Sequence, residues 1–205
     1  MVIKIGVLEL QGNFALHHKV LSKLEIESLS IKYKKDLNNV NGLIIPGGES
    51  TTISLLIDSF KLRSHLIEFS KSNPIMGTCA GLILMAKNVP DKRVNPLGLI
   101  NIDIERNAYG RQIMSRTECI NFNFNKKINF DLETTFIRAP KITKIKKNGI
   151  KILAKYKNSP IAILSDHFLG LTFHPELNDI SIFHQILFDP KSEVYYQKLN
   201  QKHAA

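Results

Sequence analysis

Gly77-Thr78-Cys79-Ala80-Gly81 is the stretch around which we expect the fold to be organised. It follows a short apolar run at residues 74–76, typical of a buried strand, and precedes an apolar run at residues 82–86, typical of a helix. A strand, a Gly-x-nucleophile-x-Gly turn and a helix together make a nucleophile elbow, here with Cys79 in place of serine. Both glycines suit the turn, because a side chain would obstruct its sharp bend.

The predicted position of Cys79 would activate its thiol. At a helix N-terminus, free N–H groups and the helix dipole favour the thiolate over the thiol. The same N–H groups can stabilise an oxyanion that develops on a substrate carbonyl. The alternative is a buried structural cysteine between two turn glycines, because free Cys is among the most buried residue types. The pentapeptide alone leaves both interpretations open.

Length and composition favour a soluble α/β protein. We expect residues 1–205 to form a single domain with a full-sized core. Hydrophobic residues make up 43% of the chain and charged residues 22%, as in ordinary globular proteins. No apolar run approaches the roughly 20 residues of a membrane span, and the N-terminus lacks the layout of a signal peptide. With only Cys79 and Cys119 present, we expect a reducing compartment and a cytoplasmic location.

The net charge of +10 raises nucleic-acid binding as an alternative function. It arises from 28 Lys and Arg residues against 18 Asp and Glu residues. The excess is mostly lysine, scattered over residues 32–35, residues 141–157 and the C-terminal tail. No helix-turn-helix, RNP-type or zinc-finger pattern accompanies it, so we interpret these lysines as a solvated surface and expect no nucleic-acid partner.

The first half of the chain alternates strand-like and helix-like segments. We expect strands at residues 3–8, 26–33, 40–45 and 74–76, and helices after Asn13, from Thr51 or Thr52, and over residues 60–70. Asn13 is positioned to cap the first helix. The alternation predicts a mostly parallel sheet covered on both faces, with sites beyond the carboxyl ends of its strands. The segments at that edge are Gln11-Gly12, Gly47-Gly48 and Cys79.

The loop Pro46-Gly47-Gly48-Glu49-Ser50-Thr51-Thr52 follows the third predicted strand. Glycine-rich loops often hold phosphates, but this one lacks the lysine of a P-loop and carries Glu49, which would repel an anion. Two adjacent glycines with free N–H groups fit a carbonyl or oxyanion site better. A plain turn remains the alternative.

From residue 89 to about residue 157 the pattern becomes more β-like and less regular. The further predicted strands are at residues 99–104, 118–124, 135–140, 153–156, 161–164 and 168–173. Arg106 and Arg138 could bind a substrate carboxylate, for which the planar guanidinium group suits bidentate pairing. Taken singly, each of these arginines is more often a surface or structural ion-pair residue.

His174-Pro175-Glu176 follows the last predicted strand. Pro175 disfavours helical geometry at His174, so we expect an extended segment in which side chains two residues apart point to the same side. His174 and Glu176 would then face one way, as a base and its orienting carboxylate do. Four other histidines are interpreted as solvated or core residues: His17, His18, His167 and His184.

Cys79, His174 and Glu176 together supply a nucleophile, a general base and an orienting carboxylate. The combination is much more specific than its parts. Zinc binding by the same residues is a rival interpretation, but no C-x-x-C or H-E-x-x-H spacing supports it.

These motifs resemble those of the class I, or triad, glutamine amidotransferases. Within that class the chain resembles the PdxT/SNO family, the glutaminase subunits of pyridoxal 5'-phosphate synthase, over nearly its whole length. Besides the elbow, the resemblance is carried by Leu10-Gln11-Gly12, the loop at residues 46–52, Glu105-Arg106-Asn107, Gly110-Arg111-Gln112, Phe136-Ile137-Arg138-Ala139-Pro140 and Phe173-His174-Pro175-Glu176-Leu177. Tyr109 stands where Phe or Tyr is expected.

The resemblance implies a three-layer α/β/α, flavodoxin-like fold with a mostly parallel central sheet, forming one glutaminase domain. It implies hydrolysis of L-glutamine to L-glutamate and ammonia through a γ-glutamyl thioester on Cys79, with His174 as the base and Glu176 as its orienting group. Gly48 and Ala80 would form the oxyanion hole. The residues implied to hold glutamine are Gly48, Glu49, Ser50, Arg106, Ile137 and Arg138.

The resemblance also implies a partner. Family members pair with a (β/α)8-barrel synthase subunit of the PdxS/SNZ type, which consumes the ammonia and helps to complete the oxyanion hole. A hetero-oligomer is therefore expected. No metal or organic cofactor is implied, since pyridoxal 5'-phosphate is the product of the complex. Two alternatives stay open: a glutaminase subunit for another acceptor, as in imidazole glycerol phosphate or anthranilate synthesis, and a non-catalytic basic binding module.

Overall fold

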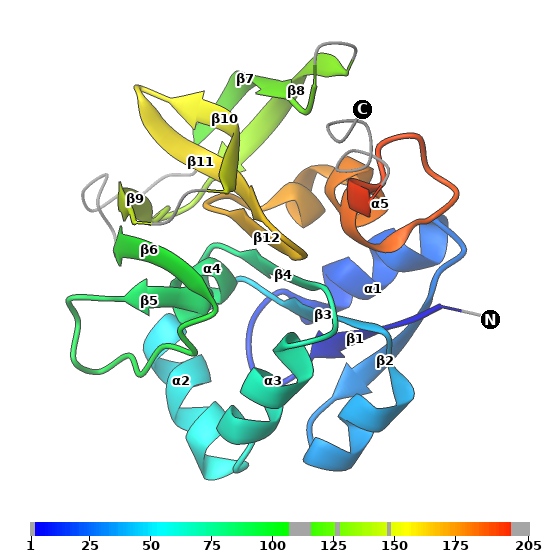
Figure 1. Cartoon of the computed structure of the whole chain (residues 1–205), viewed down its shortest axis with the longest axis vertical. Helices are drawn as coiled ribbons and strands as arrows, with labels where there is room; N and C mark the ends of the chain where they lie inside the picture. The colour runs from blue at the N-terminus through cyan, green and yellow to red at the C-terminus, as the bar shows by residue number, and fades with distance from the viewer. Residues whose placement is uncertain (1–2, 107–115, 126–127, 147–148, 198–205) are drawn as a thin grey trace.

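A seven-stranded sheet lies at the centre of the molecule, with helices on both of its faces (Figure 1). The computed structural model describes residues 3–106, 116–125, 128–146 and 149–197. The strand order is β10-β11-β12-β4-β3-β1-β2. All pairings from β12 to β2 are parallel, whereas β10 and β12 both pair with β11 in antiparallel fashion. The predicted mostly parallel sheet is therefore confirmed.

Strands, α-helices and 3-10 helices are each numbered in the order in which they occur along the chain. The strands are β1 (Lys4–Leu8), β2 (Glu27–Ile31), β3 (Gly42–Ile45), β4 (Ile75–Thr78), β5 (Ala86–Asn88), β6 (Ile100–Glu105), β7 (Arg116–Asn123), β8 (Asn129–Phe136), β9 (Lys141–Ile145), β10 (Ile150–Tyr156), β11 (Ser159–Ser165) and β12 (Phe168–Leu171). The α-helices are α1 (Phe14–Lys23), α2 (Ser50–Ser59), α3 (Arg63–Ser70), α4 (Ala80–Met85) and α5 (Ile182–Phe188). Two 3-10 helices are η1 (Lys34–Asn39) and η2 (Pro175–Asn178).

Strand β3 shows how the two faces of the sheet are covered. Ile44 belongs to the core that α1 and α5 close, whereas Leu43 and Ile45 belong to the core that α2, α3 and α4 close. Successive strand residues point to opposite faces, so one buried apolar strand serves both cores. The predicted three-layer arrangement is thereby confirmed.

Two smaller sheets are built from strands between Ala86 and Ile145: β5-β6-β9 and the hairpin β7-β8. The hairpin is joined to the α5 side of the core by aromatic contacts. Phe122 packs edge-on against Phe173 at 5.7 Å between ring centroids, and against Phe183 at 5.2 Å. The β7-β8 hairpin thus contacts the chain immediately before His174.

Some strand boundaries predicted for the region after α4 are wrong. The strand predicted at residues 135–140 instead begins at Asn129 and ends at Phe136. It ends there because the chain turns at Arg138, whose φ of 44° lies in the left-handed region that strands do not use. The short strand β5 and the lysine-rich strand β9 were not predicted, since neither carries a clear alternating pattern.

Part of the predicted polar loop falls on Asn107, Tyr109 and Gly110-Arg111-Gln112, which lie outside the described residues. Across the four described ranges, no helix combines the length and the apolar character that crossing a membrane requires. Nor does any group of three His, Cys, Asp or Glu side chains within those ranges have an arrangement that could hold a metal ion.

Candidate active site

Cys79 occupies a sharp turn between β4 and α4, so the predicted elbow is present. Its φ of 46° and ψ of −101° are uncommon for a residue with a side chain and mark local strain. The turn is held because the Cys79 N–H donates to the Leu171 carbonyl at 2.8 Å. Close packing explains the second glycine: a Cβ at Gly81 would lie 1.9 Å from the Ile45 carbonyl oxygen. The thiol is 7% exposed.

Strand β12 runs parallel to β4 and leads into His174, which lines the same cavity as Cys79. His174 Nδ1 lies 2.7 Å from Glu176 Oε1, and the two residues are 5% and 2% exposed. The predicted pairing is present, and His174 lies outside the helical region as predicted, with φ −116° and ψ 85°, but the residues after it are not extended. Pro175 opens the 3-10 helix η2, for which its fixed φ is suitable, and the first turn of this helix carries Glu176 back to His174.

Burial and neighbouring charges have opposite effects on this pair. Burial disfavours the imidazolium form of His174, but hydrogen bonds with Cys79 and Glu176 outweigh it and raise the pKa of His174 to about 10. Burial likewise opposes ionisation of Glu176, but the hydrogen bond from His174 and the nearby His17 outweigh it and lower the pKa of Glu176. At neutral pH the pair is therefore held as an imidazolium and a carboxylate.

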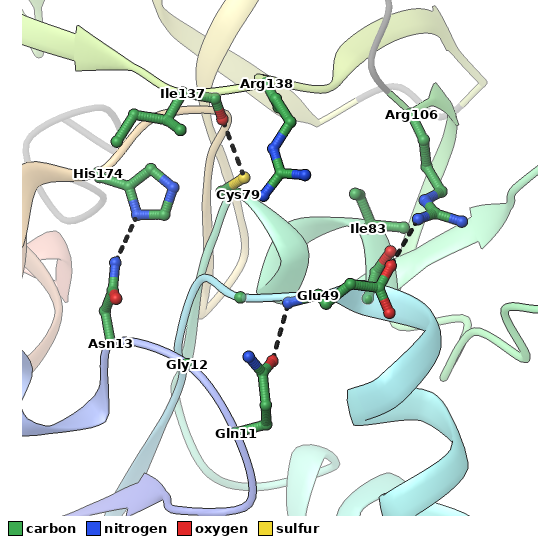
Figure 2. A pocket seen from close by; sticks show the side chains of 12 residues that line it. Gln11, Gly12, Asn13, Glu49, Cys79, Ile83, Arg106, Ile137, Arg138 and His174 are labelled. Carbon is green, nitrogen blue, oxygen red and sulfur yellow. Dashed lines mark hydrogen bonds and ion pairs between the residues drawn. The ribbon is translucent and has the colours of Figure 1, made fainter. Parts of the chain in front are cut away.

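Asn13 reaches this pair instead of capping α1. It precedes the helix as predicted, but its side chain makes no capping hydrogen bond. Its amide Nδ2 lies 3.4 Å from His174 Nδ1 (Figure 2). The same Nδ2 lies 3.5 Å from Glu176 Oε1. The predicted cap is wrong: capping would require Asn13 Oδ1 to accept from a helix N–H, whereas the side chain turns its Nδ2 towards Glu176, whose carboxylate accepts from it. The sequence did hold one signal for this role, because Asn13 directly follows Gln11-Gly12 at the predicted edge of the sheet.

Glu49 caps helix α2, which consequently begins at Ser50 and not at Thr51 or Thr52 as predicted. Its Oε2 accepts from the Thr52 N–H at 2.7 Å and from the hydroxyls of both threonines. Burial opposes ionisation of this side chain, but the bonds from Thr51 and Thr52 outweigh it and lower the pKa of Glu49 to about 2. The loop therefore presents a fixed negative charge.

The two predicted arginines have different surroundings. Arg106 bridges two carboxylates. Its Nη2 lies 2.7 Å from Glu49 Oε1 (Figure 2), and its Nη1 pairs with Asp91. Arg138 is exposed at the cavity and makes no ion pair with a described residue. Arg138 is thus free to bind an anion, whereas Arg106 holds Glu49 in place. Asp91 was missed because its segment has no regular pattern.

Of the two predicted oxyanion-hole residues, Gly48 lines the cavity with Cys79 and Ala80 follows Cys79 directly in the chain. Ala80 is the first residue of α4, so its N–H has no partner within the helix. Gly48 packs against the Gln11 side chain, whose Oε1 accepts from the Glu49 N–H at 2.8 Å (Figure 2). A Cβ at Gly48 would lie 2.4 Å from that oxygen and 3.0 Å from the Gly12 Cα, so a side chain here would displace Gln11 from the Glu49 N–H.

A cavity of about 320 Å³ brings most of these residues together (Figure 2). The predicted site residues that line it are Gly48, Glu49, Ser50, Cys79, Arg106, Ile137, Arg138 and His174. The remaining lining comes from Gln11, Gly12, Asn13 and Ile83. Ala80 and Glu176 are buried behind this wall. The cavity combines a thiol, a base and separated charges of both signs, which suits a small zwitterion with an electrophilic carbonyl.

Comparison with known proteins gives one consistent match. The model of the SNO glutamine amidotransferase family matches residues 7–189. A pyridoxal 5'-phosphate synthase subunit PdxT from Solibacter usitatus is 42% identical over 187 residues, which cover 89% of this chain and 96% of the relative. The PdxT subunit from Dictyoglomus turgidum is also 42% identical, over 93% of this chain and 100% of the relative.

Solved structures agree with this match. A crystal structure of a glutamine amidotransferase superposes with a TM-score of 0.82 at 33% identity, covering 89% of this chain and 96% of the other. PurLQS from Thermotoga maritima superposes with a TM-score of 0.65 at 14% identity, covering 98% of this chain and 100% of that one. The second likeness concerns the fold alone.

Proposed function

The chain belongs to the SNO glutamine amidotransferase family, and we propose that it hydrolyses L-glutamine to L-glutamate and ammonia with Cys79 as the nucleophile. The observation that carries the catalytic assignment is the shared cavity. Cys79, at the elbow, and His174, backed by Glu176 at 2.7 Å, both line it. A nucleophile, a base and an orienting carboxylate in this arrangement are the parts that acyl transfer requires.

In the first half-reaction, the Cys79 thiolate attacks the side-chain amide carbon of glutamine. The carbonyl oxygen becomes an oxyanion, which the N–H groups of Gly48 and Ala80 stabilise. His174 gives its proton to the amide nitrogen, the C–N bond breaks, and ammonia leaves. A γ-glutamyl thioester remains on Cys79.

In the second half-reaction, His174 takes a proton from water as the water attacks the thioester carbonyl. The C–S bond breaks and glutamate is released. His174, again protonated, faces the regenerated Cys79 thiolate. Glu176 stabilises the imidazolium in both halves and fixes the orientation of its ring.

The charges of the cavity suit the two ends of the amino acid. Arg138, which has no ion pair with a described residue, binds the α-carboxylate. Glu49, ionised and held by Arg106, faces the α-ammonium group. The Ser50 hydroxyl and the Ile137 carbonyl complete the glutamine site, the latter 4.0 Å from Cys79 Sγ.

The relatives are named as subunits of pyridoxal 5'-phosphate synthase. We infer that this chain delivers its ammonia to a synthase subunit, and that the partner is the (β/α)8-barrel subunit of the PdxS/SNZ type. Direct transfer within a hetero-oligomer makes chemical sense because free ammonia would be lost to protonation and diffusion. We place the reaction in the cytoplasm, where the thiol of Cys79 stays reduced.

The test is glutamate release from L-glutamine, measured with and without the barrel synthase subunit. We expect activity that depends on the partner, is abolished in Cys79→Ala and is unchanged in Cys119→Ala. Cys119 is the matched control because it is the other free cysteine and lies exposed on β7. Full activity in Cys79→Ala would refute the assignment of Cys79 as the nucleophile. Absence of glutamate release in the presence of the partner would refute glutamine hydrolysis as the activity.

A further inference from the structure

Two buried histidines lie next to the pair formed by His174 and Glu176. His17 comes from α1 and His184 from α5, two helices that lie next to each other on one face of the sheet (Figure 1). Both side chains are fully buried, at 0% exposure. His17 Nδ1 lies 3.0 Å from His184 Nε2, and His17 Nε2 lies 3.6 Å from Glu176 Oε2. The chain of contacts therefore runs His184, His17, Glu176, His174.

The second oxygen of Glu176 explains why a donor is needed here. Oε1 is engaged by His174 and approached by Asn13. Oε2 is buried and has no hydrogen-bond partner among the described residues. A buried carboxylate oxygen without a donor is costly. The His17 nitrogen at 3.6 Å is slightly beyond hydrogen-bond range, but the dipole of an N–H directed at a carboxylate is attracted to its charge over this distance in a buried site.

The proton positions follow from the contacts. Burial lowers the pKa of His17 to about 4, although Glu176 opposes this, and burial together with His17 lowers that of His184 well below its ordinary value. Both rings are therefore neutral at pH 7, with one N–H each. A carboxylate only accepts, so the His17 proton sits on Nε2. Nδ1 of His17 then accepts from Nε2–H of His184, and His184 Nδ1 keeps a bare lone pair.

The unpartnered nitrogen agrees with this assignment. His184 Nδ1 is a buried atom without a hydrogen-bond partner among the described residues. It is the one position where the assigned tautomers place a lone pair facing no donor. The Thr78 hydroxyl, 3.4 Å from His17 Nε2, is the other polar group beside that nitrogen.

We propose that His17 is a positioning residue of the active site: its Nε2–H, fixed in this tautomer by His184, holds the carboxylate of Glu176 in the orientation that serves His174. The inference rests on the catalytic role proposed for His174 and Glu176. A neutral donor suits the task because it orients the carboxylate without cancelling its charge. A lysine or arginine in its place would compete with the imidazolium of His174 for the same charge.

Two substitutions of equal polarity separate positioning from packing. In His17→Gln the side-chain amide reaches the place of Nε2 and keeps a donor for Glu176. In His17→Asn the shorter amide reaches only the place of Nδ1 and keeps the contact with His184. We expect His17→Asn to lower kcat about 10- to 100-fold, the usual effect of losing an outer supporting partner, with KM within about twofold, because glutamine does not touch His17.

His17→Gln should restore kcat to within about threefold of the unaltered protein, and the acid limb of the pH profile should shift only in the Asn variant. His18→Asn is the matched control, since His18 is the neighbour on α1 and contacts Ser28 instead, at 2.7 Å. All proteins are assayed with the synthase subunit, and thermal melting confirms folding.

Equal kcat in the Gln and Asn variants, whether retained or lost, would overturn the inference. If His17→Asn does not fold, His184→Gln replaces it: its amide can still donate to His17 Nδ1, so kcat should stay within about threefold, and a larger loss would contradict the tautomers assigned here. Absence of glutamate release by the unaltered protein with its partner would instead overturn the proposed function, and this inference with it.

Discussion

The backbone of Gly47 lies directly against the imidazole of His174. A Cβ at this position would lie 2.2 Å from His174 Cε1 and 2.8 Å from Nδ1. The ring is buried and tied to Glu176, so it cannot move aside without losing that contact. The glycine is therefore required by the base and not only by the turn.

Gly47→Ala should accordingly abolish base catalysis while leaving a folded protein. We expect kcat to fall by at least about 100-fold, the lower part of the range for general-base catalysis. Glutamate release measures the loss of catalysis, and circular dichroism checks that the variant is folded. Gly98→Ala is the contrast: a Cβ there meets nothing within 4 Å, but φ is 72°, so stability should fall by about 1 kcal/mol with turnover unchanged.

Glu176→Gln should lower the pKa of His174, because the carboxylate is one of the two groups that stabilise its imidazolium form. Titration followed by NMR of the ring nitrogens measures the change directly, and we expect a fall of about one unit or more. kcat should fall by up to about 10⁴-fold, since an amide favours the wrong tautomer of the base. Glu68→Gln, at an exposed site on α3, should change neither quantity. An unchanged pKa of His174 in Glu176→Gln would show that Glu176 does not stabilise the imidazolium form of the base.

The stability of the protein should be greatest near pH 6.5. Below this pH the unfolded chain binds protons that the buried, neutral His17 and His184 exclude, so stability falls as the pH approaches 4. For His17 alone the loss is about 3 kcal/mol. Above pH 6.5 the folded state holds a proton on His174 that the unfolded chain releases, so stability falls again towards pH 10. Urea unfolding between pH 4.5 and pH 9 should therefore give a maximum, and a curve that rises steadily would contradict these assignments.

Asp91→Asn should weaken glutamine binding without changing the rate of the chemical step. The change removes one of the two carboxylates that fix Arg106, and Arg106 holds Glu49 at the cavity. We expect KM to rise about 3- to 10-fold, corresponding to about 1 kcal/mol, with kcat nearly unchanged. Arg93→Lys is the control because Arg93 also pairs with Asp91 but is exposed. A fall in kcat with KM unchanged would place Arg106 in the chemical step.

The elbow could be predicted from the sequence because its signal is local. A strand, two glycines at fixed spacing and a helix stand next to one another, and the alternation of short apolar strands with helices predicted the parallel sheet. The pairing of His174 with Glu176 was also predicted, although the backbone achieves it by a 3-10 turn. Pro175 permits either geometry, and only the packing of the turn decides between them.

The roles of Asn13, Asp91 and His17 in supporting the site could not be predicted because their partners are distant in the chain. Asn13 satisfies the rule for a helix cap, and its position after Gln11-Gly12 places it at the edge of the sheet, but nothing local shows that its amide will be turned towards a buried carboxylate. Asp91 lies in a segment without periodicity, and its partner Arg106 is brought to it by strand β6. From the sequence, His17 is one polar residue on an amphipathic helix, and only the folded structure shows that α5 brings His184 into contact with it.

The nucleophile and the base follow two strands, β4 and β12, that are hydrogen-bonded to each other, and the Cys79 N–H is itself bonded to Leu171. Their separation is consequently set by the spacing of neighbouring strands and not by the long stretch of chain between them. In evolutionary terms, the parts of that intervening stretch that do not line the cavity can lengthen, shorten or exchange their loops, and so acquire new surfaces for other partners, while the separation of nucleophile and base stays the same.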